Sequence, residues 1–171
     1  MTRPRTVGIA TLAVVSALAI PARAQQLLLG GGVAASSGVE GGDAGAGETQ
    51  FRRARTRLSL QLDGRVDEDP REGLGVVVYA DVEPHAGVGA ELRYLRWLGP
   101  RTVAFVGVTS VIAPRTLFGG ELGAQLRFPV GKQGPVLFVE PSFAALPLGT
   151  DLPGDRPVIW ALLGVGIHVD L

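Results

Sequence analysis

The end of the chain alternates between two kinds of side chain with a period of two residues. From Ile159 to Leu171 every odd position is apolar, whereas the even positions pass from Trp160 and Leu162 through two glycines to polar residues. The two glycines and four β-branched residues of this stretch favour a strand over a helix. A strand of this length with one continuous apolar face is typical of the wall of a membrane β-barrel.

The N-terminus has the features of a signal peptide that is removed on export. Arg3 and Arg5 precede an apolar run from Val7 to Ile20, and residues 22–24 (Ala-Arg-Ala) match a cleavage site. The apolar run is short for a transmembrane helix and is followed by Pro21, so cleavage is favoured over an uncleaved anchor. We therefore expect residues 1–24 to be a signal peptide and residues 25–171 to form one β-barrel domain.

The composition of the expected mature chain narrows the classes of function. The whole chain has 16 basic and 16 acidic residues, and the signal peptide removes three arginines, which leaves 13 basic residues and a net charge of −3. This balance argues against a nucleic-acid partner, which would require a basic face. The chain has no cysteine, so no disulfide framework is expected. No apolar run after residue 24 approaches the ~20 residues of a membrane-spanning helix, so the repeated one-sided apolar segments favour strands.

The same alternation recurs along the rest of the expected mature chain. It is clearest from Arg53 to Arg65 and continues there over about a dozen residues, longer than the ~5–6 residues usual in soluble sheets. From Thr102 to Ala113 both faces are apolar, so the register of that strand stays open, and Pro141 predicts a bulge or an early strand end. The pattern predicts eight strands: Gln26–Ser36, Arg53–Arg65, Leu74–Val82, Ala86–Leu98, Thr102–Ala113, Leu117–Phe128, Pro135–Leu146 and Ile159–Leu171.

The connections between these strands differ in length. Two are long: Ser37–Gln50, whose Gly-rich and acidic composition predicts a mobile loop, and Pro147–Pro157. With an even number of strands, both long connections fall at one end of an up-and-down barrel and both termini at the other. The predicted fold is therefore all-β: an eight-stranded antiparallel up-and-down β-barrel, transmembrane. The other connections are short turns near residues 67–70, 83–85, 99–101, 114–115 and 131–134.

The less apolar face of the predicted strands carries charged residues that we expect to line the lumen. In lipid, a basic side chain near the midplane would cost ~2–4 kcal/mol, whereas inside the barrel acids and bases can pair. An eight-stranded barrel is just wide enough for side chains to fill it, so the pattern predicts a packed polar interior and not a conducting pore. The predicted lumen residues are Arg53, Arg55, Arg57, Asp63, Glu91, Arg93, Glu121, Arg127 and Glu140.

With these features the chain resembles the small eight-stranded outer-membrane barrels of Gram-negative bacteria, the OmpA/OmpX type. The resemblance covers the whole expected mature chain and consists of architecture and alternation, without a diagnostic motif. It implies the outer membrane of a Gram-negative bacterium, contact with outer-membrane lipid, and recognition of the C-terminal strand by the barrel assembly machinery. Barrels of this type usually end in an aromatic residue, and here the last residue is Leu171. Their roles vary, so the resemblance does not select one.

We expect a non-enzymatic barrel with a structural or interaction role and with no cofactor, no metal and no nucleic-acid partner. The loops contain no aromatic cluster that could form a binding hot spot, and His85 stands alone in its turn.

A lipid-modifying enzyme is one alternative. His168 and Asp170 share a strand face, and Ser110 or Ser142 could supply a hydroxyl, although no nucleophile motif accompanies them.

A second alternative is a soluble periplasmic barrel that binds a small apolar ligand, like a lipocalin. It requires apolar residues inside and polar residues outside, and alternation alone does not distinguish the two orientations. Long strands and short turns favour the membrane.

Overall fold

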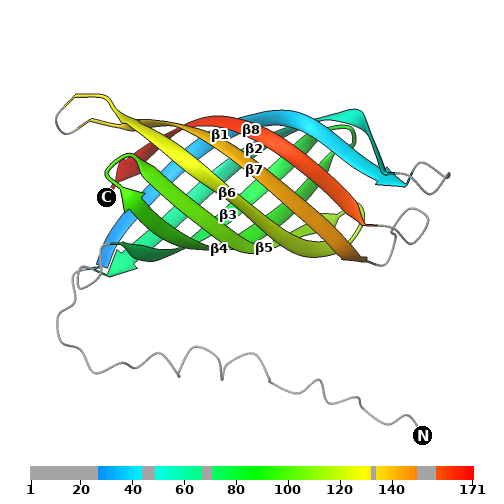
Figure 1. The fold of residues 1–171 in the computed structure, drawn as a ribbon, viewed down its shortest axis with the longest axis horizontal. Coiled ribbons are helices and arrows are strands. Elements are labelled where there is room, and N and C mark those ends of the chain that lie inside the picture. The colour runs from blue at the N-terminus through cyan, green and yellow to red at the C-terminus, as the bar shows by residue number, and fades with distance from the viewer. Residues whose placement is uncertain (1–26, 44–48, 67–70, 132–133, 150–156) are drawn as a thin grey trace, which may run out of the picture.

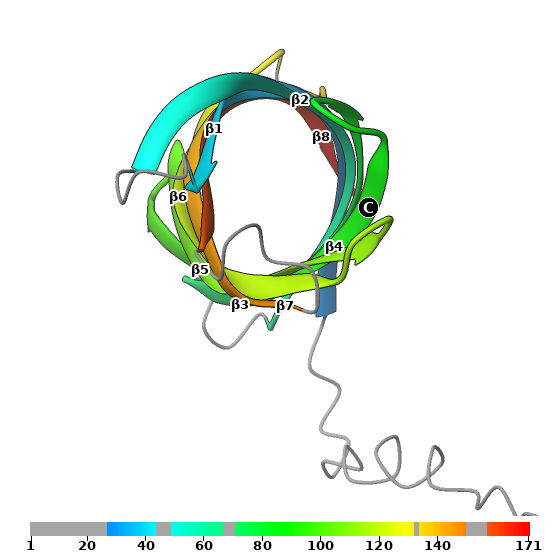
Figure 2. The same ribbon diagram turned by 90° about the vertical axis from the view of Figure 1, so that its right-hand side faces the viewer.

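The computed structural model describes residues 27–43, 49–66, 71–131, 134–149 and 157–171, and the predicted signal peptide lies outside these ranges. The described residues form eight antiparallel strands that close in sequence order into a barrel, as predicted (Figure 1). Seen along its axis, the barrel is a closed ring of strands (Figure 2). The strands are β1 (Leu27–Asp43), β2 (Thr49–Val66), β3 (Glu72–Glu83), β4 (Gly87–Gly99), β5 (Thr102–Ala113), β6 (Leu117–Pro129), β7 (Val136–Gly149) and β8 (Val158–Asp170). Within the described part of the chain, no helix is long and apolar enough to cross a membrane.

The barrel closes where β1 pairs with β8. Their register aligns Val33 with Ile167 and Val39 with Ala161, and the backbone N–H of Leu171 donates to the carbonyl of Leu29 at 2.9 Å. The start of β1 and the C-terminus therefore lie at the same end of the barrel, which we call the terminal end (Figure 1). The opposite end, where β3 connects to β4 and β5 to β6, is called the loop end.

The prediction of a loop over Ser37–Gln50 is wrong for most of that segment. β1 continues to Asp43 and β2 begins at Thr49, so that Val39 pairs with Ala54 and Gly42 with Gln50. Glycines carry no side chain that could show an alternation, yet their backbone groups form the same ladder as any other residue. The ladder shifts register once here, between Glu40 and Gly41.

The bulge or strand end predicted at Pro141 is also wrong. β7 runs through Pro141, whose partner on β8 is Leu163. The register between β6 and β7 is the same on both sides of the proline, since Gly123 pairs with Ser142 and Leu126 with Val139. Pro141 is exposed on the outside of the barrel, and the irregularity of this ladder lies instead between Phe118 and Gly120.

Alternate residues of each strand point to opposite sides of the wall. The structure resolves the register of β5, which the sequence left open: Val103 and Phe105 are buried inside, whereas Val106 and Val108 are exposed outside. Among the residues that the structure describes, buried apolar side chains form two clusters in the interior. The loop-end cluster comprises Val111, Leu117, Ala144, Leu146, Val158, Trp160 and Leu162. The terminal-end cluster comprises Leu95, Val103 and Phe105, with Trp97 packed against it.

Candidate functional site

A network of buried ion pairs occupies the barrel interior between the two apolar clusters. Arg57 donates from Nε to Asp81 Oδ1 at 3.0 Å and from Nη1 to Glu91 Oε1 at 2.8 Å. Arg93 donates from Nε to Glu91 Oε2 at 2.8 Å and from Nη1 to Glu140 Oε1 at 3.0 Å. All of these side chains are buried, so each charge is held by an opposite charge instead of by bulk water.

Towards the loop end, the network continues through Arg55, which forms ion pairs with Glu40 and Asp81. The guanidinium of Arg55 also lies 4.1 Å from the centre of the Trp160 ring, and that of Arg57 lies 3.5 Å from the Tyr79 ring. A desolvated cation over an aromatic face is attracted by the ring quadrupole. The contact with Trp160 attaches the ion pairs to the loop-end cluster.

Towards the terminal end, the network continues through the amide side chains of Gln61 and Gln125 to Arg127. Gln125 Nε2 donates to Glu140 Oε2 at 2.6 Å and to Gln61 Oε1 at 3.0 Å. Arg127 donates from Nε to Gln125 Oε1 at 3.1 Å. The amides of Gln61 and Gln125 therefore link Arg127 to the carboxylate of Glu140.

The predicted lumen residues do not all belong to the central ion-pair network. Asp63 lies outside the central network, at the terminal end, where its Oδ1 is 2.5 Å from His168 Nε2. The side chain of Arg53 lies outside the part of the chain that the structure describes. The seven others are buried: Arg55, Arg57, Glu91, Arg93, Glu121, Arg127 and Glu140.

Four members of the network were not predicted from the sequence: Glu40, Gln61, Asp81 and Gln125. Glu40 fell in the segment that we expected to be a loop. The other three occupy the inward-facing parity of their strands, and that parity is the signal that could have identified them. Asp81 alternates with the exposed residues of β3, and Gln61 and Gln125 alternate with those of β2 and β6.

His168 is fully buried, its Nε2 lies 2.5 Å from Asp63 Oδ1, and its Nδ1 lies 3.7 Å from Asp170 Oδ1. Ser142 pairs with Leu162, six residues along β8 from His168, or ~20 Å at ~3.3 Å per residue. Ser110 lies near the loop end of β5, where it pairs with Phe118 of β6. The register therefore separates both serines from the histidine.

The outer wall is apolar over most of its height. On β3 the exposed residues run from Leu74 to Val82 without a charge, and Glu72 and Glu83 lie at the two ends of the strand. Glu72 Oε1 is 3.6 Å from Arg96 Nη1, and Glu83 Oε2 accepts a hydrogen bond from Thr56 Oγ1 at 3.2 Å. Among the strand side chains whose exposure the structure describes, the exposed charged ones lie at or near the strand ends: Glu72, Glu83, Arg96 and Asp170.

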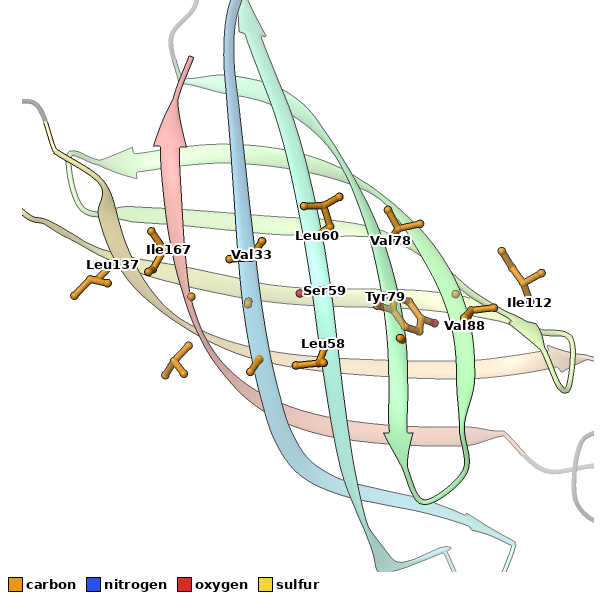
Figure 3. A pocket seen from close by; sticks show the side chains of 16 residues that line it. Val33, Leu58, Ser59, Leu60, Val78, Tyr79, Val88, Ile112, Leu137 and Ile167 are labelled. Carbon is orange, nitrogen blue, oxygen red and sulfur yellow. The ribbon is translucent and has the colours of Figure 1, made fainter.

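The outer wall also contains a broad hollow of about 1020 Å³ (Figure 3). Exposed side chains of neighbouring strands line it, among them Val33 of β1, Leu58 and Leu60 of β2 and Val78 of β3. The lining includes Ser59, which belongs to the inward-facing set of β2. The hollow is therefore lined mainly by apolar residues of the outer wall, with some inward-facing residues such as Tyr79.

Within the described residues, no group of three or more His, Cys, Asp or Glu side chains could hold a metal ion. A scan against protein-family models gives no match for this chain, and a search of curated proteins gives none either.

Proposed function

We propose that the chain is a non-enzymatic outer-membrane β-barrel of a Gram-negative bacterium, with a side-chain-filled polar interior and a structural or interaction role in the cell envelope. The observation that carries the proposal is the division between the two sides of the wall. Exposed leucine, valine, isoleucine and phenylalanine side chains surround the outside, and arginines and carboxylates fill the inside. In water these outer apolar side chains would be exposed to solvent, which is unfavourable. In a membrane they would contact lipid hydrocarbon instead.

The height of the apolar zone fits a membrane. Leu74 and Val82 are eight residues apart on β3, which corresponds to ~27 Å along a strand. With the ~35–45° tilt of membrane barrels, this is a band ~20 Å tall, comparable to the ~25 Å apolar band of outer-membrane barrels. Tyr94 and Arg96 lie near the terminal end of β4, where an interface with lipid headgroups would be.

A soluble barrel that binds an apolar ligand requires an apolar interior large enough for that ligand. Here the interior contains buried ion pairs flanked by two packed apolar clusters, and a cavity within it measures about 10 Å³. These features favour the membrane proposal over the lipocalin-like alternative. The separation of His168 from Ser110 and Ser142 favours a non-enzymatic role in the same way.

The partners follow from this proposal. The outer wall would contact outer-membrane lipid, and the C-terminal strand β8 would be the segment read by the barrel assembly machinery. An interaction role would use the connections at the loop end, because they face away from the termini.

Cell fractionation tests the proposal. Cells that express the full chain are separated into periplasm and membranes, the outer membranes are washed with carbonate or urea, and gel mobility is compared with and without boiling. Retention in washed outer membranes together with a heat-dependent mobility shift is the expected result. Release into the periplasmic fraction would contradict the proposal and would make the search for a soluble ligand the next step.

A further inference from the structure

A small cavity lies in the barrel interior beside the ion-pair network. One side of it is formed by small residues on neighbouring strands, Ser142 of β7, Gly164 of β8, Ser36 of β1 and Ser59 of β2. The space exists because these side chains are too short to reach the charged groups opposite them. Its volume of about 10 Å³ is close to the minimum that admits a single water molecule.

The register explains why the cavity has charged groups at its edges. Gly164 pairs with Glu140 of β7 on one side and with Ser36 of β1 on the other, and Ser36 in turn pairs with Arg57 of β2. A row of inward-facing residues therefore runs from a carboxylate through two small residues to a guanidinium. Glu121, from β6, also lines the cavity.

Two of the charged groups that line the cavity have a buried atom without a hydrogen-bond partner in the described protein. These atoms are Arg57 Nη2 and Glu121 Oε2, and both residues are only 3% exposed. The other donors of Arg57 are used by Asp81 and Glu91, and the nearest ion-pair contact of Glu121 is a long one, 3.6 Å from its Oε1 to Arg93 Nη2. Buried polar atoms in native proteins are almost always paired with protein or with ordered water.

We infer that this cavity is a binding site for one water molecule, which accepts a hydrogen bond from Arg57 Nη2 and donates one to Glu121 Oε2. The water also has the serine hydroxyls of the lining within the same cavity, so it can reach the roughly three hydrogen bonds that buried waters usually make. It links β2 to β6 across the lumen. The site does not depend on whether the barrel lies in a membrane.

The chemistry of the two unpaired atoms selects water over an ion. One of them is a donor that carries positive charge and the other is a carboxyl oxygen that can accept, so the occupant must both accept and donate. A cation would be repelled by Arg57 and Arg93, and an anion would be repelled by the carboxylates of Glu91 and Glu140, which also line the cavity. A small neutral molecule with both functions satisfies the pair, and the volume limits it to the size of water.

A crystal structure of the folded protein, purified from cells that express the full chain, tests the site directly. Crystals are grown with rubidium as the monovalent cation, at a resolution that shows ordered water. The expected result is a density peak within hydrogen-bond distance of Arg57 Nη2 and Glu121 Oε2, without anomalous signal. An anomalous rubidium peak at that position, or the absence of density there, would overturn the inference.

Gly164→Ala tests the contribution of the water to stability. A methyl group at this position would lie 3.4 Å from Ser36 Cβ and 3.5 Å from the Glu140 carbonyl oxygen, so it fits without a clash and takes the space of the water. We expect the density peak to disappear and the equilibrium constant for unfolding to rise about tenfold or more, because the donor and the acceptor stay buried and unpaired.

Gly75→Ala is the matched control. Gly75 is also buried and faces inward, and its added methyl would meet Leu95 Cδ1 at 3.4 Å and the Leu62 carbonyl oxygen at 3.5 Å. This methyl contacts the terminal-end cluster and displaces no water, so we expect no rise in the unfolding constant. Equal stability of the two variants would overturn the inference. If Gly164→Ala does not fold, the density in the unchanged protein decides the question.

Discussion

Arg93 on β4 joins Glu91 on its own strand to Glu140 on β7, with its Nη1 3.0 Å from Glu140 Oε1. Because β4 and β7 are not neighbours in the barrel, this ion pair crosses the lumen. The guanidinium also lies 4.0 Å from the centre of the Phe105 ring, in the terminal-end cluster. Arg93 therefore connects two non-neighbouring strands across the lumen and attaches the ion pairs to the terminal-end cluster.

We predict that Arg93→Met destabilises the barrel by ~3–5 kcal/mol, because it leaves Glu91 and Glu140 buried without this cation. The measurement is the free energy of unfolding in urea of the protein refolded in detergent. Arg96→Met is the control, since the Arg96 side chain is 60% exposed and its contact with Glu72 is 3.6 Å long. We expect that control to change the free energy by no more than about 0.5 kcal/mol. Equal effects of the two substitutions would contradict the role of the buried network.

Gly89 on β4 has no side chain, and the ring of Tyr79 on β3 occupies the space that a side chain would take. A Cβ atom at this position would lie 2.2 Å from Tyr79 Cζ and 2.4 Å from the Ser110 carbonyl oxygen, which accepts a 3.0 Å hydrogen bond from the tyrosine hydroxyl. We predict that Gly89→Ala costs ~1–3 kcal/mol through overpacking. Gly120→Ala, where the nearest atom is 3.7 Å away, should be close to neutral in the same urea titration. A neutral Gly89→Ala would show that the ring does not occupy this position.

Because the outer wall is apolar, we expect the destabilisation caused by a charged substitution there to depend strongly on its depth in the membrane. Leu60→Arg, near the middle of β2, should destabilise the protein in lipid vesicles by ~2–4 kcal/mol, because the guanidinium would lie in hydrocarbon. Leu98→Arg, near the terminal end of β4, should cost ~0–1 kcal/mol. Urea unfolding in vesicles measures both. In a soluble barrel both side chains would contact water, and the two substitutions would have similar, small effects.

The filled lumen predicts that the protein does not conduct ions. The loop-end cluster, the ion-pair network and the terminal-end cluster follow one another along the axis, and the cavity beside the network measures only about 10 Å³. We expect no steady conductance when the protein is inserted in planar bilayers under a transmembrane voltage. Stable single-channel steps from correctly folded protein would contradict the packing of the interior.

The sequence predicted the barrel and its two faces because alternation is a local property of a strand. It did not predict the ends of β1 and β2, since Gly41 and Gly42 have no side chains and their pairing depends on the partner strand. It also gave no register for β5, where Val103 and Val106 are equally apolar and only closure of the barrel selects the inward one.

The partners within the buried polar network could not be predicted for a related reason. Gln61 and Glu140 are 79 residues apart in the chain, and their contact depends on the register of every strand between them. The contact partner of His168 could not be predicted either. It shares a strand face with Asp170, but its short contact at 2.5 Å is with Asp63 on β2. Local alternation separated the two faces of most strands, and the closure of the barrel determined which side chains meet.

Spin-label accessibility at Leu60 tests the central claim most directly. The chain has no cysteine, so Leu60→Cys provides a single labelling site on the outer wall, with Leu98→Cys near the terminal end as the control. The labelled protein is refolded in lipid vesicles, and collision rates with oxygen and with a water-soluble nickel chelate are compared. We predict that the label at position 60 collides with oxygen and is shielded from nickel, whereas the label at position 98 is more accessible to nickel. Free access of nickel to position 60 would show that the apolar wall faces water and would contradict the membrane proposal.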